Sequence, residues 1–275
     1  DTDSPKGMCT TFLAYKIINR LKKENVDFLD FPNLVRFNPN IPWKTRGNGA
    51  VGIKISTSNP GKIKNLVKKF VKQYSDVKNG ANPGLVFCQD ENIPDEFLQI
   101  SSDAMWKLIH RNQAKKILSK YNIDFFYLGN GQGLVGATSV IGYNFKDQTY
   151  ELLSYRKSSQ FGKKRSIDKF KVKEMQEKTY PNTFNSFDSN KNKVLLMPHG
   201  PDPVFYGVRG EDSSTLISAS KMIKPKEKLA GYLIFKSNQG TGDHLKNEID
   251  VNNFLPYTSG TLQGTVSTKP IVTKG

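Results

Sequence analysis

The sequence has little cysteine, little histidine and no long apolar run, and each shortage excludes a class of protein. Its two cysteines, Cys9 and Cys88, and its three histidines are too few for a disulfide framework or a Cys-rich zinc site. No apolar stretch approaches the roughly 20 residues that span a bilayer, and the first residues are acidic and polar, so we expect neither membrane attachment nor a signal peptide. These features are typical of a protein of the reducing cytoplasm.

Acidic residues are also few relative to basic ones. The 275 residues include 41 Lys and Arg against 25 Asp and Glu, which gives a formal net charge of +16. Such an excess attracts polyanions, for example RNA or an anionic membrane surface. The charge indicates a class of partner but does not identify one.

The spacing of apolar residues predicts an α+β protein of two domains. Helices are expected at 10–25, 62–74, 101–120 and 213–222, and strands at 34–37, 50–55, 84–88, 150–155, 194–197, 204–208 and 231–235. The charged segment 161–178 is expected to be an exposed excursion. Glycines 129, 131 and 133 mark the strongest break, so we expect domains at 1–128 and 129–256, the second a ferredoxin-like split βαβ unit.

The opening segment carries the residues best suited to phosphate chemistry. Asp1 and Asp3 precede Gly7 and a helix start that bears Thr10. Two nearby carboxylates can share Mg²⁺, and the free N–H groups at a helix N-terminus favour a phosphoryl group. A threonine there can coordinate the metal or accept the phosphoryl group. The same residue types also form ordinary helix caps, so the spacing alone leaves both interpretations open.

A second candidate is the loop PNIPWKTRGNG, residues 39–49. Lys44 and Arg46 can reach phosphate oxygens, and the glycines at 47 and 49 permit close approach of the backbone. A proline-braced hairpin with solvated basic residues would have the same composition, and that alternative stays open.

The third candidate is a group of polar residues late in the chain. They occupy the strand-end segments PHGPDPVFYGVRGE and SNQGTGDHL, a common place for functional residues. Those singled out are Asp202, Tyr206, Arg209, Glu211 and Asp243. The histidines in these segments, His199 and His244, are more often surface residues than catalysts.

Seven motifs in this order resemble those of the archaeal tRNA(Ile) agmatidine synthetases over nearly the whole chain. They are DTDSPKGMCTT, LVRFNPNIPWKTRGNGAV, GQGLVGATSVIG, YELLSYR, PNTF, PDPVFYGVRGE and SNQGTGDHL. The resemblance implies a kinase-like domain, a ferredoxin-like domain and, at 257–275, the start of an OB-fold. It implies that the chain is a fragment without most of the OB-fold, the zinc ribbon, and the strand and further Asp that precede Asp1 in the family.

The resemblance also implies roles for individual residues. Thr10 matches the family threonine that is phosphorylated from ATP, and Asp1 and Asp3 match its Mg²⁺-binding partners. Gly7 and the second kinase-domain motif, with Lys44, Arg46, Gly47, Asn48 and Gly49, are expected at the nucleotide. Agmatine is a dication, for which carboxylates and an aromatic wall are suitable. Asp202, Tyr206, Arg209, Glu211 and Asp243 are the candidates for binding agmatine or RNA.

The implied activity is that of a ligase that forms a C–N bond. ATP phosphorylates the C2 oxygen of the wobble cytidine of isoleucine tRNA with a CAU anticodon, and agmatine then replaces that oxygen. The product agmatidine lets the tRNA read AUA. The alternative hypothesis is an RNA-binding module without catalytic activity.

Overall fold

The computed structural model describes residues 2–44, 47–89, 92–250, 252, 255–269 and 271. The helices are α1 (Thr10–Leu21), α2 (Pro60–Tyr74), α3 (Asp95–Ala104), α4 (Arg111–Lys120), α5 (Leu134–Ser139), α6 (Lys169–Thr179) and α7 (Ser213–Met222), with short 3-10 turns at Val77–Asn79, Ser158–Gln160 and Asp243–Leu245. The strands are β1 (Asp27–Phe28), β2 (Asn33–Arg36), β3 (Gly49–Gly52), β4 (Ile55–Ser56), β5 (Gly84–Phe87), β6 (Asp124–Tyr127), β7 (Thr149–Arg156), β8 (Thr183–Phe184), β9 (Phe187–Asp188), β10 (Lys193–Val194), β11 (Val204–Gly210) and β12 (Leu229–Ser237). The expected α+β class is confirmed.

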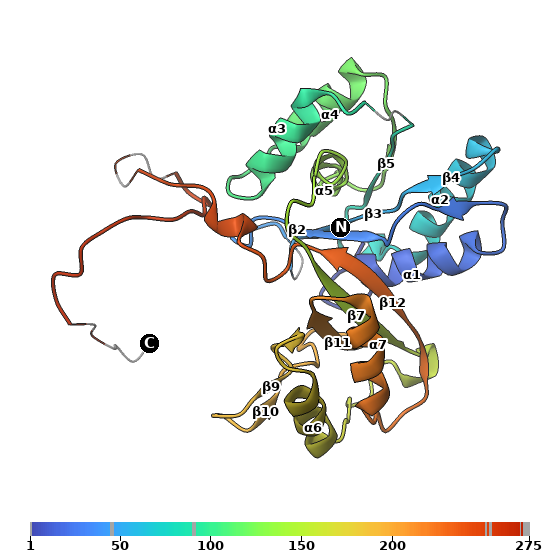
Figure 1. Cartoon of the computed structure of the whole chain (residues 1–275). Helices are drawn as coiled ribbons and strands as arrows, with labels where there is room; N and C mark the ends of the chain where they lie inside the picture. Colours follow the sequence, from blue (N-terminus) through green and yellow to red (C-terminus); the bar gives the residue numbers. More distant parts are fainter. Residues whose placement is uncertain are drawn as a thin grey trace.

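One six-stranded sheet joins the two halves of the chain. Its order is β3-β2-β12-β7-β11-β8, and its neighbouring strands are antiparallel except for β2 and β12. Those two pair in parallel, with Asn33 opposite Lys236 and Leu34 opposite Ser237. Figure 1 shows β2, in blue, beside the orange β12 at the centre of the molecule. The sheet is therefore continuous across the boundary expected near Gly129.

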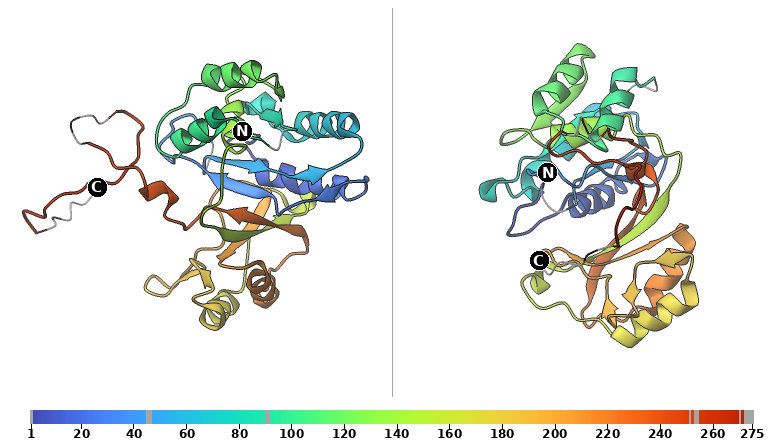
Figure 2. Two further views of the ribbon diagram at one scale, coloured as in Figure 1. Left: turned by 45° about the horizontal axis from the view of Figure 1, so that its top comes forward. Right: turned by 90° about the vertical axis from the view of Figure 1, so that its left-hand side faces the viewer.

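Helices cover both faces of this sheet. Successive residues of a strand point to opposite faces. Leu153 and Phe235 pack against Phe12 of α1 on one face, whereas Leu152 and Ile234 pack against α6 and α7 on the other. Figures 1 and 2 show α6 and α7 side by side over the β7 and β11 part of the sheet, far from α3 and α4. α1 thus lies directly on strands of the second half, and this contact fixes the position of its N-terminus.

Most predicted elements are present close to their expected bounds. The helix expected at 213–222 is α7, the helix expected from residue 10 is α1, and the basic amphipathic helix is α2. The strands expected at 34–37, 150–155, 204–208 and 231–235 correspond to β2, β7, β11 and β12. The segment 50–55 instead divides between β3 and β4, which belong to different sheets. The strand expected at 84–88 is β5, which is half-buried and pairs with β6 in a separate two-stranded sheet.

The single helix expected at 101–120 was a wrong prediction, because the chain forms α3 and α4 there. Ser101 does not cap a helix but lies buried inside α3, which begins at Asp95. Met105 and Ile109, between the two helices, are buried in the core beside β2 and β3. The His110 side chain then accepts a hydrogen bond from the Asn112 N–H and starts α4. Burial of the connecting residues therefore separates two helices whose apolar spacing looks continuous.

The exposed excursion expected at 161–178 was also a wrong prediction. Asp168 caps α6 by accepting hydrogen bonds from the N–H groups of Phe170 and Lys171. Val172 and Met175 are completely buried in the same core as α7. These two apolar residues, three apart, anchor a helix that is otherwise charged, and such a narrow apolar stripe gives a weak signal in the sequence.

No helix in the described parts of the chain is both long and apolar enough to cross a membrane. After β12 the chain still contacts the body of the molecule at Thr258, which is buried, and at Ser259, whose N–H donates to the Trp106 carbonyl. The described residues from Gly260 on are exposed, and Figure 2 shows this last segment, in red, extending away from the body. Among the described residues beyond 254, Thr261 forms an isolated β-bridge, and its partner is Glu248.

The N-cap of α7 gives the first testable prediction. The Asp212 carboxylate accepts hydrogen bonds from the Ser214 hydroxyl and from the Thr215 N–H and hydroxyl, and these bonds lower its pKa to about 2. Asp212→Ala should lower the free energy of unfolding by about 0.5–2 kcal/mol at neutral pH. Because the folded pKa is depressed, this contribution is present above the ordinary Asp pKa of about 3.9 and is lost as the pH falls through the folded value.

Urea denaturation at a series of pH values measures this effect. Asp212→Asn is the matched control, since the amide oxygen still caps the helix but does not titrate. The difference in unfolding free energy between the unaltered protein and Asp212→Asn should shrink toward acid pH. A difference that is independent of pH would contradict the assignment.

Candidate functional site

A cavity of about 190 Å³ lies where the start of α1, the β2–β3 loop and the start of α5 meet. Six of the residues singled out in the sequence line it: Asp3, Thr10, Lys44, Gly47, Asn48 and Gly49. Asp3 and Thr10 come from the opening segment, and the other four residues come from the segment that leads from β2 into β3. The two segments meet because α1 packs against the sheet at β2 and β3. We call this the first cavity.

The N-terminus of α1 opens into the first cavity. Cys9 is the N-cap residue, and its side chain makes no capping hydrogen bond. Thr10 is the first helical residue, and its hydroxyl lies 3.1 Å from the hydroxyl of Thr2. The first turn of a helix has N–H groups without intrahelical partners and the positive end of the helix dipole, so this position favours an anion beside the Thr10 hydroxyl.

Asp3 is the acidic residue of the opening segment that the structure places at the cavity. Its side chain is nearly buried, with 6% of the residue exposed, and it lines the first cavity together with Thr10. Asp1 lies outside the described residues. Among those described, no group of three or more His, Cys, Asp or Glu side chains could hold a metal ion on its own. Asp3 and the Thr10 hydroxyl are nevertheless hard oxygen donors of the kind that Mg²⁺ uses when phosphate and water complete its shell.

The β2–β3 loop provides the opposite wall. Lys44, Gly47, Asn48 and Gly49 line the cavity, while Arg46 lies outside the described residues. Asn48 has a positive φ of 43°, and its side-chain amide donates a 2.7 Å hydrogen bond to the Asn38 carbonyl. Asparagine is one of the few residues that tolerate this conformation, which turns the loop back toward β3.

Several cavity residues were missed in the sequence. Arg36 and Lys107 add two cations, and Gln132, Gly133 and Gly136 bring in the GQGLVGA motif. That motif contributed to the resemblance, but its glycines were interpreted as a domain break. A Cβ on Gly84 would lie 2.2 Å from the Leu134 backbone nitrogen, so β5 and α5 meet backbone to backbone at this wall. Within the motif, a Cβ on Gly136 would lie 3.2 Å from the Cβ of Ala50, so this glycine lets α5 pack closely on β3.

A hydrogen-bond network holds the loop in place. Asn38 is completely buried, its amide donates to the Tyr257 carbonyl at 2.7 Å, and its side-chain oxygen accepts from the Asn40 N–H and the Ser259 hydroxyl. Asn38→Ala leaves these groups without partners and should lower the free energy of unfolding by about 1–3 kcal/mol, as measured by urea denaturation. Asn252→Ala is the control on an exposed asparagine and should change stability by less than about 0.5 kcal/mol. Equal stability of the two variants would contradict this role of Asn38.

A second cavity, of about 660 Å³, lies on the other side of the opening segment. Its wall includes Lys6, Gly7 and Met8, together with loops at 161–165 and 199–202. Gly7, which was expected at the nucleotide, therefore lines the second cavity. The segment between Asp3 and Thr10 separates the two cavities.

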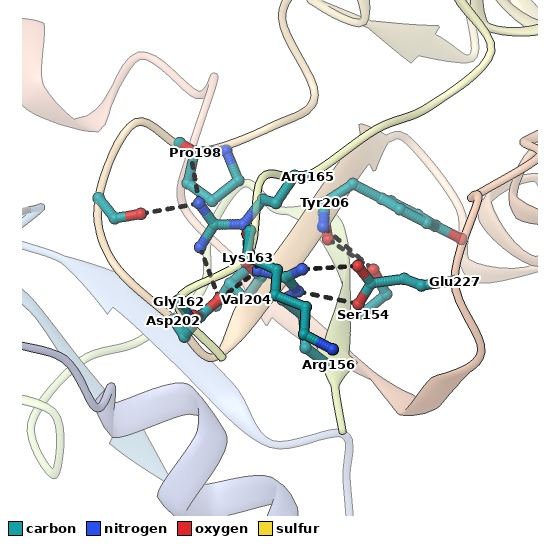
Figure 3. Close-up of polar contacts among 11 residues, drawn as sticks. Ser154, Arg156, Gly162, Lys163, Arg165, Pro198, Asp202, Val204, Tyr206 and Glu227 are labelled. Carbon is teal, nitrogen blue, oxygen red and sulfur yellow. Dashed lines mark hydrogen bonds and ion pairs between the residues drawn. The ribbon is translucent and has the colours of Figure 1, made fainter. Parts of the chain in front are cut away.

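Asp202 is the agmatine or RNA candidate that lines the second cavity. Figure 3 shows its carboxylate between two arginines. It accepts hydrogen bonds from Arg156 at 2.9 Å, from Arg165 at 3.4 Å and from the Gly162 N–H at 2.6 Å. The negative charge of Asp202 is therefore already balanced by the two arginines.

The other four candidates lie apart from Asp202. Tyr206 is buried in the core over α7, and burial raises its pKa to about 12. Arg209 forms an ion pair with Glu151 at 3.7 Å, and Glu211 is exposed beside Asn182. Asp243 accepts a hydrogen bond from Tyr143 and pairs with Lys246. The structure therefore does not gather these residues into one site.

Comparison with known proteins finds two family models and several relatives that are described as TiaS. The family model described as the TiaS TCKD domain matches residues 1–65, and the TiaS FLD domain matches residues 131–244. The isoleucine tRNA 2-agmatinylcytidine synthetase TiaS of Cenarchaeum symbiosum is 47% identical over 275 residues, which are 100% of this chain and 61% of that protein. The enzyme of the same name from Thermococcus sibiricus is 38% identical over 98% of this chain and 63% of its own length.

Solved structures give the same result. Apo TiaS, an isoleucine tRNA agmatidine synthetase, superposes with a TM-score of 0.91 at 32% identity and covers 100% of this chain and 65% of that one. A complex of TiaS with its isoleucine tRNA, AMPCPP and agmatine has a TM-score of 0.85 at 31% identity, with 94% of this chain and 63% of that one covered. The chain thus spans less than two thirds of the length of these relatives.

Proposed function

Because the chain belongs to the family of isoleucine tRNA 2-agmatinylcytidine synthetases, we propose that it carries the ATP-dependent part of a ligase that replaces the C2 oxygen of a wobble cytidine with agmatine. The substrate is isoleucine tRNA with a CAU anticodon. The product is agmatidine, which pairs with the AUA codon. A cytoplasmic location agrees with a tRNA substrate.

The observation that carries the proposal is the first cavity. It joins a threonine at a helix N-terminus, a buried carboxylate and a lysine-bearing glycine loop, which together suit transfer of a phosphoryl group. The Thr10 oxygen attacks the γ-phosphorus of ATP, the bond from that phosphorus to the β-γ bridging oxygen breaks, and ADP leaves. Lys44 stabilises the negative charge of the phosphates, and Asp3, which lines the same cavity as Thr10, accepts the proton that the hydroxyl loses.

Magnesium fits the donor set of the first cavity. Asp3, with Asp1 as the further carboxylate expected from the sequence, would hold it and would leave positions for phosphate oxygens and water. When bound, the ion neutralises the developing charge on the phosphates. Arg46, Gly47, Asn48 and Gly49 complete the proposed nucleotide site, whereas Gly7 lines the second cavity.

Phosphorylation makes the cytidine reactive. The C2 oxygen is a poor leaving group until it carries a phosphoryl group, which it takes from phosphorylated Thr10 with return of the threonine oxygen or from ATP with release of ADP. The primary amine of agmatine then attacks C2, and the C2–O bond breaks to release phosphate. The second cavity, on the far side of the opening segment, is the proposed location for the amine and the flipped base, with Asp202 as a carboxylate in its wall. Tyr206, Arg209, Glu211 and Asp243 remain weaker candidates.

The proposal assigns the parts of the chain to domains. Residues 1–128 form a kinase-like domain, 129–256 a ferredoxin-like domain, and 257–275 the start of an OB-fold. The antiparallel order β12-β7-β11-β8, with α6 and α7 on one face, supports the ferredoxin-like assignment.

Incorporation of labelled agmatine into isoleucine tRNA tests the function. With ATP and Mg²⁺, the protein should transfer the label to tRNA with a CAU anticodon and should not label a tRNA in which the wobble cytidine is changed to uridine. Equal labelling of both tRNAs would refute the proposed substrate.

The second candidate function is RNA binding without chemistry, which the net charge of +16 favours. Titration calorimetry separates the two. The ligase requires binding of magnesium-ATP, whereas an RNA-binding module would bind tRNA and show no heat with nucleotide.

A further inference from the structure

A buried cluster of charge lies behind the first cavity, at the join between the two halves of the sheet. Glu151 of β7 is 1% exposed, and its carboxylate faces two arginines. Arg36 of β2 donates to it at 3.2 Å, and Arg209 of β11 lies 3.7 Å away. The Ser237 hydroxyl donates to its other oxygen at 3.1 Å.

Glu151 stays ionised in this cluster. Burial acts to raise its pKa, but the charges of Arg36 and Arg209 outweigh burial, and the pKa is lowered. Two guanidinium groups therefore share one carboxylate, and the cluster has a net charge of +1. A buried ion pair is weak evidence for stability, because desolvation of the charges offsets much of their attraction. The surplus positive charge instead favours an anion at the open end of the cluster.

Arg36 is that open end. Arg36 lines the first cavity with Asp3, Thr10 and Lys44, and 21% of its side chain is exposed. Its backbone is fixed by Asn238, whose buried side chain accepts from the Arg36 N–H at 2.8 Å and donates to its carbonyl at 3.0 Å. The backbone of Arg36 is thus held by Asn238 and its guanidinium by Glu151, and neither of these residues lines the first cavity.

The glycines of the β2–β3 loop make room for this guanidinium. A Cβ on Gly47 would lie 2.8 Å from Nη1 of Arg36, and a Cβ on Gly49 would lie 3.4 Å from it. The Nη1 side of the guanidinium therefore lies against the bare backbone of Gly47 and Gly49, while Nη2 donates to Glu151. Gly47 and Gly49 line the first cavity together with Thr10 and Lys44, so Nη1 is the guanidinium nitrogen on the side of the loop that the phosphates would meet.

We propose that Arg36 binds the phosphate chain of the nucleotide in the first cavity and that Glu151 is the residue that positions it. The inference rests on the proposed function and adds a binding residue and its support to it. A guanidinium presents two parallel N–H groups to phosphate oxygens, and a pre-positioned donor stabilises developing charge without reorganisation. Glu151 acts only through Arg36, because it is buried and lines neither cavity.

Variants at the two positions test the proposal through phosphoryl transfer from ATP and binding of magnesium-ATP. Arg36→Met should slow labelling of the protein by about 100-fold or more, and Arg36→Lys, which keeps the charge but loses the fork, by about 10-fold. Glu151→Gln should slow the maximal rate by about 10-fold with a smaller change in the KM for ATP, and it should have little further effect in the Arg36→Met background.

The control is Lys236→Met. Lys236 is a partly buried cation on the same sheet, paired with Asp30 at 2.5 Å, and it lines neither cavity. This variant should label within about twofold of the unaltered rate. Thermal melting of each variant distinguishes a loss of positioning from a loss of folding. If Arg36→Met does not fold, Arg36→Lys is used in its place, because it preserves the buried charge pair.

The outcomes separate this inference from the proposed function. If the unaltered protein binds magnesium-ATP but takes up no label, the threonine acceptor is wrong, and weaker ATP binding by Arg36→Met still supports Arg36. If folded Arg36→Met binds ATP as tightly and is labelled as fast as the unaltered protein, the inference is overturned. If the unaltered protein does not bind magnesium-ATP, both are overturned.

Discussion

Thr10→Ala is expected to abolish transfer of the γ-phosphoryl group from ATP to the protein. The variant removes the hydroxyl that lines the first cavity at the N-terminus of α1 and leaves the helix intact. Alanine is a better helix former than threonine, so no loss of folding is expected. Loss of the nucleophile should lower labelling by at least about 10³-fold, which is the scale reached when a covalent nucleophile is removed.

Thr11 provides the matched control for this prediction. Its hydroxyl lies 3.0 Å from the sulfur of Cys9, and 5% of the residue is exposed. Thr11→Val keeps the shape of the side chain and should keep the label. Incubation with radiolabelled ATP, followed by mass spectrometry of the phosphopeptide, identifies the modified residue. Phosphate on Thr11, or equal label on Thr10→Ala and the unaltered protein, would refute the assignment.

Six residues of the first cavity were predictable because they stand in motifs with a local signature. Asp3 and Thr10 stand in a helix-start motif, and Lys44 and the glycines at 47 and 49 stand in a loop motif. Each motif suits phosphate by its own chemistry. The sequence also placed α1 and α7 well, since their apolar residues repeat with the helical period.

The long-range parts of the site were not predictable. Arg36 looks like an ordinary strand residue until its partner Glu151, 115 positions later, is placed behind it by the parallel pairing of β2 with β12. No local pattern specifies that pairing, because either strand would satisfy its apolar pattern in another sheet. The second cavity depends on the same tertiary arrangement. Asp202 was identified by its position in a turn, but its engagement by two arginines was not visible.

Removal of Arg156 is expected to destabilise the protein more than any other single change to its ion pairs. This arginine is 1% exposed. Figure 3 shows it between its two acidic partners, Asp202 and Glu227. It donates to both oxygens of Glu227, at 2.8 and 2.6 Å, and to Asp202 and the Lys163 carbonyl at 2.9 and 2.7 Å. Arg156→Met should lower the free energy of unfolding by about 3–5 kcal/mol, because the nearly buried Glu227 carboxylate loses this arginine and Asp202 loses one of its two arginines.

Urea denaturation at neutral pH measures this loss, with Lys171→Met as the control. Lys171 pairs with Glu174 on the exposed face of α6, and such a pair contributes at most about 1 kcal/mol. If uncompensated charge is the cause, Arg156→Met/Glu227→Gln should be more stable than Arg156→Met alone, since it removes the charge of the Glu227 carboxylate that has lost its arginine. A loss below about 1 kcal/mol in Arg156→Met, or a double variant less stable than the single one, would show that packing and not charge balance holds this corner of the second cavity.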